Sequence, residues 1–186
     1  MDVARCRLEP LSAASPIARF ECEDQEINDY IVSEALEDNL RGLARTFVEL
    51  DIDKPVTENV AGFFTLRAHA LTIECSHFEE FDESDDEDCE IEVPLVELMW
   101  LARDIKWKGS GVGPTLMWDA IRLANEVSER IGFIGMHLRT NQMGERLYRE
   151  FDFRTFRAHN SSDAARYVLP IEDIRMMAES TKGLQI

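Results

Sequence analysis

The sequence predicts an α/β (or α+β) protein with one central, mainly antiparallel sheet of six to seven strands flanked by helices. Strand-like segments outnumber helix-like ones, and the two kinds occur in mixed order along the chain. The length of 186 residues suits one domain and is short for two. Apolar residues make up 45% of the chain, which is enough for a buried core. We therefore expect a single domain over residues 1–186.

The first half of the chain contains three expected strands and one expected helix. Residues 3–9 form a plausible first strand. Residues 24–41 predict a helix with Asp24 as its N-cap and with apolar residues near helical spacing at Ile27, Ile31, Ala35 and Leu40. Residues 45–52 alternate and end in the turn-forming DIDKP, which predicts a strand and a hairpin loop. Residues 60–73 then predict a long strand.

The second half begins with the nearly continuous apolar run 93–103, as expected for a strand covered on both faces. A helix over 115–131 follows, with one apolar stripe made by Leu116, Ala120, Leu123, Val127 and Ile131. The remaining expected elements are a strand, a short helix with Asn141 as candidate N-cap, two strands and a terminal helix, at residues 133–139, 142–151, 153–156, 165–169 and 172–179.

The charge is strongly negative and unevenly distributed. Twenty Lys and Arg against 37 Asp and Glu give a net charge of −17, which argues against general DNA binding. Ten of the fourteen residues 79–92 are acidic, and they break the apolar pattern, so we expect an exposed acidic loop at about 76–92. Two interpretations of this run remain: a solvated loop, or a negatively charged surface that steers a cationic substrate towards the site. A calcium loop is weakly indicated, because the run lacks the ligand spacing and turn glycine.

The cysteines indicate a reducing, cytoplasmic setting. Cys6, Cys22, Cys75 and Cys89 are scattered without a CxxC pair, so no disulfide framework is expected. Cys75, His77 and Cys89 have irregular spacing and lack a fourth ligand, so we expect no metal site. No apolar run approaches the ~18 residues of a membrane span, so no membrane partner is expected.

The strongest chemical signal is a cluster of glycines at 109, 111 and 113, between an apolar strand and an amphipathic helix. Glycine permits positive φ, so successive backbone N–H groups can point at one ligand, and the helix N-terminus adds partial positive charge. Pro114 is acceptable in the first helical turn. The cluster predicts binding of a phosphate or pyrophosphate, or else a tight turn without a ligand. The triphosphate P-loop and the dinucleotide fingerprint are both absent.

Three segments resemble the GNAT superfamily of N-acetyltransferases. LARDIKWKGSGVGPTLM resembles motif A, with Lys108 at its Gln/Arg position. RTNQMGERLYREFDF resembles motif B: Asn141 and Tyr148 match, whereas Asp152-Phe153 replaces Gly-Phe. FECEDQEINDYIVSEALEDNLRGLARTFVELD is similar to the start of the toxin–antitoxin GNAT group, whose toxins acetylate aminoacyl-tRNA.

The resemblance implies acetyl-CoA as cofactor and direct attack by an amine in a ternary complex. The implied cofactor-binding residues are Leu101, Ala102 and Arg103 for the pantetheine arm, the loop residues Lys108, Gly109, Ser110, Gly111, Val112 and Gly113 for the pyrophosphate, and Asn141 and Tyr148. Tyr148 would protonate the leaving thiolate, since a phenol with a pKa near 10 suits a basic leaving group. Glu97 is the first candidate for the general base and His69 the second, with a water chain as the alternative to either.

Three functions remain open from the sequence. The first is an N-acetyltransferase for a primary amine of cationic character on a small molecule, peptide or protein, since the acidic surface would steer a cation. The second is a toxin that acetylates aminoacyl-tRNA and has an antitoxin partner, although the net charge disfavours tRNA. The third is a non-catalytic acyl-CoA-binding module. A homodimer is a further expectation.

Overall fold

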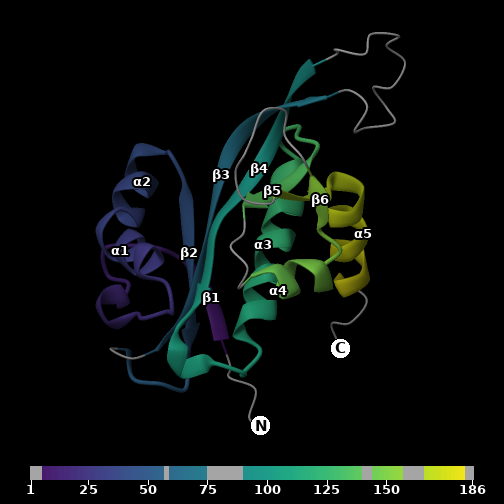
Figure 1. Ribbon diagram of the computed structural model, residues 1–186. Coiled ribbons are helices and arrows are strands. Elements are labelled where there is room, and N and C mark those ends of the chain that lie inside the picture. Colours follow the sequence, from purple (N-terminus) through teal and green to yellow (C-terminus); the bar gives the residue numbers. More distant parts are fainter. Residues whose placement is uncertain (1–5, 57–58, 75–89, 140–143, 157–165, 183–186) are drawn as a thin grey trace. The chain divides into compact units, whose positions relative to one another are not determined.

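A computed structural model describes residues 6–56, 59–74, 90–139, 144–156 and 166–182. Its seven strands form one sheet in the order β1-β2-β3-β4-β5-β7-β6 (Figure 1). The strands are β1 Cys6–Pro10, β2 Arg45–Asp51, β3 Val60–Glu74, β4 Glu90–Arg103, β5 Gly135–Arg139, β6 Arg154–Phe156 and β7 Arg166–Pro170. The helices are α1 Gln25–Ser33, α2 Ala35–Arg41, α3 Val112–Ser128, α4 Glu145–Glu150 and α5 Ile171–Lys182, with 3₁₀ turns η1 Ile17–Arg19 and η5 Ile105–Trp107.

The strand pairing confirms the predicted fold class. β1 pairs antiparallel with β2, and β2 pairs antiparallel with β3 across the predicted DIDKP hairpin. β7 pairs antiparallel with both β5 and β6. All seven predicted strands are found, with ends shifted by up to three residues.

The chain divides into two compact units, residues 1–67 with 98–123 and residues 68–97 with 124–186. In the first unit, α1 and α2 contribute part of their apolar residues to a core shared with the strands; this core includes Phe20, Tyr30, Ile31, Ala35, Val48, Phe63 and Ala102. In the second unit, β5, β7 and α5 bury Met136, Leu138, Leu169 and Ile174, and a smaller cluster joins Leu71, Val93 and Leu95.

The predicted helix over 24–41 is wrong in its continuity. Asp24 is the N-cap as predicted, and its side chain accepts from Glu26 N–H. At Glu34, however, the backbone φ of −119° interrupts the helix, so α1 and α2 are separate. The predicted stripe is also wrong at its end, because Leu40 stands five residues after Ala35 within α2, about 140° around the helix. Ile31 and Ala35 are fully buried, whereas Leu40, predicted on the same stripe, is 81% exposed.

The predicted helix over 115–131 is shifted towards the N-terminus. α3 begins at Val112, directly after Gly111, and ends at Ser128, so Ile131 lies beyond the helix and is 56% exposed. The buried face of α3 is consequently Leu116, Met117, Ala120, Ile121 and Ala124.

The predicted acidic loop at 76–92 is too long at its end, because β4 already begins at Glu90. Its residues 76–89 lie outside the described residues. Among the described helices, none is long and apolar enough to cross a membrane.

Candidate functional site

The end of β4 is fixed by Asp104, which caps the short turn η5. Its side chain is buried and accepts from Lys106 N–H at 2.9 Å and from Glu21 N–H at 3.2 Å. Its own N–H donates to Ala61 O of β3 at 2.9 Å. These bonds tie the chain entering the glycine loop to β3 and to the segment before α1, so the loop starts from a rigid position.

The glycine loop turns through two left-handed residues, Gly109 with φ of +79° and Gly111 with φ of +88°. Only glycine adopts these values without strain, which explains the spacing of the glycines. The first N–H groups of a helix have no acceptor inside it. Pro114 has no N–H, and Thr115 N–H donates to Gly111 O. Among the described residues, Val112 and Gly113 therefore supply the first-turn amides that can face an anion.

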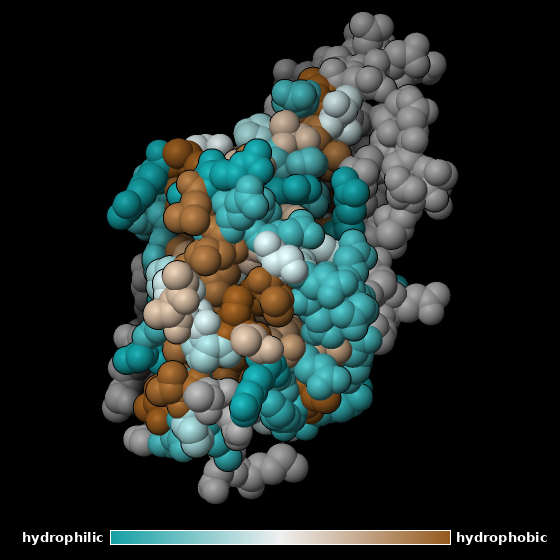
Figure 2. All heavy atoms as spheres, turned by 90° about the vertical axis from the view of Figure 1, so that its left-hand side faces the viewer, coloured by the Kyte–Doolittle hydropathy of each residue, from teal (hydrophilic) through white to brown (hydrophobic). Residues whose placement is uncertain are grey.

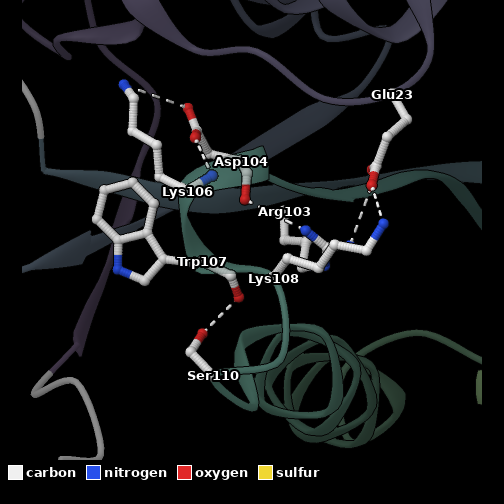
Figure 3. A network of polar contacts seen from close by, with 7 residues as sticks. All are labelled: Glu23, Arg103, Asp104, Lys106, Trp107, Lys108 and Ser110. Carbon is white, nitrogen blue, oxygen red and sulfur yellow. Dashed lines mark hydrogen bonds and ion pairs between the residues drawn. The ribbon is translucent and has the colours of Figure 1, made fainter.

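Ser110 and Trp107 hold the loop together from inside. Ser110 Oγ donates to Trp107 O at 2.6 Å, and Ser110 N–H donates to the same oxygen at 3.2 Å (Figure 3). The indole Nε1 of Trp107, which is buried, donates to Asp51 Oδ2 at 3.4 Å. Both donors of Ser110, predicted as a cofactor-binding residue, thus point at the protein, and its observed role is to shape the loop.

Lys108 and Arg103, two predicted cofactor-binding cations, converge on one carboxylate. Lys108 Nζ donates to Glu23 Oε1 at 3.0 Å and Arg103 Nη2 donates to the same oxygen at 3.3 Å (Figure 3). The hydrogen bond from Lys108 and the charge of Arg103 hold the pKa of Glu23 below its ordinary value. The two cations and the glycine loop are thereby brought together on the first unit. The other two β4 residues predicted for the pantetheine arm, Leu101 and the buried Ala102, directly precede Arg103.

Tyr148 lies on α4 in the second unit, half-buried, with its ring near those of Phe153 and Tyr167, both at 6.2 Å between centroids. The ring also lies against Gly144, the residue that precedes α4. A Cβ on Gly144 would come within 2.5 Å of Tyr148 Cε2 and 2.6 Å of Oη. The missing side chain of Gly144 therefore makes the space that the tyrosine occupies.

Asp152 explains the departure from motif B. Its φ is +57°, and among the described residues it alone has a positive φ without being glycine. Glycine, which the motif usually has here, adopts this conformation freely, and Asp is among the few other residues that tolerate it. Asn141, the remaining predicted cofactor-binding residue and candidate N-cap, lies outside the described residues.

Glu97, the predicted general base, is 3% exposed on β4. Its Oε2 lies 3.8 Å from His69 Nδ1, and its Oε1 lies 4.0 Å from Arg139 Nε. The fully buried His137 ring lies 4.7 Å from the His69 ring. The structure therefore brings the two predicted base candidates together and adds a second histidine, all within the second unit.

Comparison with known proteins defines the fold. No protein-family model matches the chain. A tyrosine-to-phenylalanine mutant of the AtaT toxin has a TM-score of 0.77 at 18% identity, over 92% of this chain and 93% of that chain. AtaT complexed with acetyl-methionyl-tRNAfMet has a TM-score of 0.76 at 18% identity, over 92% and 98%. A tyrosine-to-phenylalanine mutant of KacT has a TM-score of 0.75 at 16% identity, over 92% and 98%. The protein has the GNAT fold of these toxins.

Sequence reasoning missed Glu23 and Gly144. Glu23 is 85 residues from Lys108, and nothing local marks a pair so far apart. Gly144 had a signal, since it stands four residues before Tyr148 and side chains at i and i+4 lie one above the other on a helix.

Proposed function

We propose that the protein is an acetyl-CoA-dependent N-acetyltransferase. The observation that carries this proposal is the loop from Lys108 to Gly113, which turns through two left-handed glycines and leads directly into the seventeen-residue helix α3. Support comes from the shared fold, since AtaTR was solved bound with acetyl-CoA and has a TM-score of 0.73 at 20% identity.

The residues present suit the anionic part of this cofactor. The amides of Val112 and Gly113 offer donors at a helix N-terminus, where the partial positive charge favours a pyrophosphate. Lys108, whose side chain is 72% exposed, adds a full positive charge beside them. When bound, acetyl-CoA supplies an activated thioester. The backbone at the end of β4 would align its pantetheine arm through Leu101, Ala102 and Arg103.

The chemistry proposed for the side chains is proton transfer on either side of a direct attack by a neutral amine. Tyr148 Oη holds the proton that the departing thiolate takes up, which suits a phenol with an ordinary pKa near 10. Glu97, with His69 beside it, is the proposed proton acceptor for the amine. A group in this role typically contributes about 10²- to 10⁴-fold to the rate.

We infer aminoacyl-tRNA as a second candidate acceptor, because one structural neighbour is AtaT complexed with acetyl-methionyl-tRNAfMet. The net charge argues the other way. The acidic run 79–92 carries ten of the negative charges, and the rest of the chain is still at −7. A cationic amine on a small molecule, peptide or protein therefore stays the first candidate, since a negative surface steers it.

A protein partner such as an antitoxin is also proposed for the first unit. Figure 2 shows hydrophobic residues gathered on the face that carries α1 and α2. On these helices and directly after them, Val32, Leu40 and Leu43 are 54%, 81% and 53% exposed. Exposed apolar residues that gather in this way are typical of binding surfaces. AtaT was solved bound to the C-terminus of its antitoxin AtaR, which supports a partner of this kind.

The test is an acetylation assay with polyamines, basic peptides and aminoacyl-tRNA side by side, followed by mass spectrometry. We expect acetyl transfer to one acceptor class, at a rate that Tyr148→Phe reduces at least 100-fold. Tyr30→Phe is the matched control, because it removes a phenol of the first unit that donates to Asp38 Oδ2. Binding of acetyl-CoA without transfer to any amine would favour the non-catalytic module instead.

A further inference from the structure

Three neighbouring strands of the second unit bring together a set of metal-ligand side chains. His69 lies on β3, Glu97 on the adjacent β4, and His137 on β5, the next strand in the sheet. One ligand atom from each lies within 4.8 Å of the other two. Since adjacent strands are spaced about 4.7–4.9 Å apart, all three side chains must stand on the same face of the sheet to reach one another.

The cluster is shielded from water on most sides. His137 is 0% exposed and Glu97 is 3% exposed, whereas the His69 side chain is 24% exposed. A buried carboxylate and two imidazoles gathered at one point are costly unless hydrogen bonds, an opposite charge or a cation satisfy them. The partial exposure of His69 leaves one side from which an ion can enter.

The spacing of the groups suits a shared ion better than direct contact. His69 Nδ1 and Glu97 Oε2 are 3.8 Å apart, which is longer than a hydrogen bond. Two ligands bonded to one zinc ion at about 2.0–2.1 Å in tetrahedral geometry stand roughly 3.3 Å apart. Side-chain rotations that move the ligand atoms by about 1 Å would therefore bring them to bonding distance from one shared ion.

One cation already faces the cluster. Arg139 Nε of β5 lies 4.0 Å from Glu97 Oε1, and its side chain is 50% exposed. The arginine approaches Oε1, whereas His69 approaches the other carboxylate oxygen, Oε2. The carboxylate thus has one oxygen for the arginine and one for an ion, and Arg139 would lower the affinity without blocking the site.

We propose that His69, Glu97 and His137 bind a divalent transition-metal ion, with zinc as the best fit. Two imidazole nitrogens and one carboxylate oxygen are a ligand set typical of zinc and of other first-row metals, and three protein ligands leave a fourth position open. The site differs from the sequence expectation of no metal, which considered only Cys75, His77 and Cys89. It shares Glu97 and His69 with the proposed proton acceptor, so a bound ion would occupy the groups assigned to that step, whereas acetyl-CoA binding at the glycine loop does not involve them.

Calorimetric titration of the tag-free, chelator-treated protein with Zn²⁺ alone tests the site. Excess Mg²⁺ is present throughout, because this hard cation occupies oxygen-only sites in the acidic run and leaves an imidazole site open. Co²⁺ is the second probe, since its visible absorption reports nitrogen and oxygen ligands in tetrahedral geometry. We expect one equivalent of either metal to bind, and the melting temperature to rise with zinc.

The variants are His69→Ala and Glu97→Gln, because the fully buried His137 is the ligand whose removal most endangers folding. Each should weaken zinc binding at least tenfold and change the Co²⁺ spectrum. The matched control is the double variant His77→Ala, His159→Ala, which removes the other two histidines and should leave the affinity unchanged.

Failure to take up one equivalent of zinc, or equal binding by wild type and by both folded variants, would overturn the proposal. Acetyl-CoA binding, measured on the same preparations, reports separately on the proposed function, so each hypothesis can fail alone.

Discussion

Glu23 Oε1 lies 3.0 Å from Lys108 Nζ, so the lysine expected to meet the cofactor phosphates is held by a carboxylate from before α1. The same oxygen accepts from Arg103. An anionic ligand on the glycine loop has to compete with Glu23 for both cations. The affinity for acetyl-CoA is then set by this competition as well as by the loop itself.

The variant Glu23→Gln should therefore bind acetyl-CoA more tightly. Exposed ion pairs are worth about 0.2–1 kcal/mol, so releasing Lys108 should raise the affinity by a factor of about 1.4 to 5 at low salt, and less at high salt. Glu26→Gln makes the same charge change in the first turn of α1 and is the control. Unchanged or weaker binding by Glu23→Gln would show that Lys108 does not meet the cofactor.

The glycine loop should be sensitive to a single methyl group at Gly111. Gly111→Ala forces alanine into φ of +88°, which costs about 1–2 kcal/mol or moves the amides that follow. We expect acetyl-CoA binding at least tenfold weaker and a lower melting temperature. Gly132→Ala is the control, since Gly132 has open space for a Cβ and no positive φ. Equal affinities of the two variants for acetyl-CoA would mean that the glycine loop does not bind the cofactor.

Gly144→Ala tests whether the placement of Tyr148 matters. The new methyl group would overlap the tyrosine ring and displace its hydroxyl, and displacement of a catalytic group by about 1 Å can cost 10²-fold in rate. We expect kcat to fall at least tenfold while the affinity for acetyl-CoA is unchanged. Added to Tyr148→Phe, the substitution should have little further effect, because the hydroxyl it displaces is already gone.

Glu49 should make the protein less stable as the pH rises. It is buried on β2, and among the described residues its Oε2 has no hydrogen-bond partner. Burial, and then the charge of Asp119, raises its pKa from the ordinary 4.5 to about 7. The folded state thus binds more protons than the unfolded state between these values. The stability that Glu49 contributes is fully present below about pH 4.5 and is lost as the pH rises to about 7.

Replacing the carboxylate with an amide removes this dependence. Glu49→Gln should gain about 1–3 kcal/mol over wild type at pH 8 and little at pH 4.5, measured by urea unfolding at both values. Glu37→Gln, on an exposed ion pair with Arg41, is the charge-matched control. An equal gain at both pH values would mean that Glu49 does not titrate in this range.

Local patterns predicted much of the fold and of the loop. Asp24 stands where a helix begins, and a cap acts on the next two or three residues, so the sequence alone suffices to find it. The glycines at 109 and 111 were predicted for the same reason. A positive φ is a local property of the glycine that adopts it and depends on no distant partner. The break at Glu34 was not predictable, since no glycine or proline stands there and the following Ala35 and Leu36 favour a helix.

Relationships between distant segments account for what the sequence left open. Glu97 and His69 were predicted as separate base candidates and His137 as a core residue. Their meeting depends on the register of three strands, which apolar alternation restricts but does not determine. The pair of Glu23 and Lys108 depends likewise on how the segment before α1 returns to η5, through bonds such as Ile105 N–H to Glu21 O.

The central claim is that the loop from Lys108 to Gly113 binds acetyl-CoA, and calorimetric titration of the purified protein measures it most directly. We predict saturable one-to-one binding, weaker for the dephospho-cofactor and at least tenfold weaker for Gly111→Ala, with Gly132→Ala equal to wild type. No binding at millimolar acetyl-CoA, or equal binding by both glycine variants, would contradict the account and leave the loop as a turn between β4 and α3.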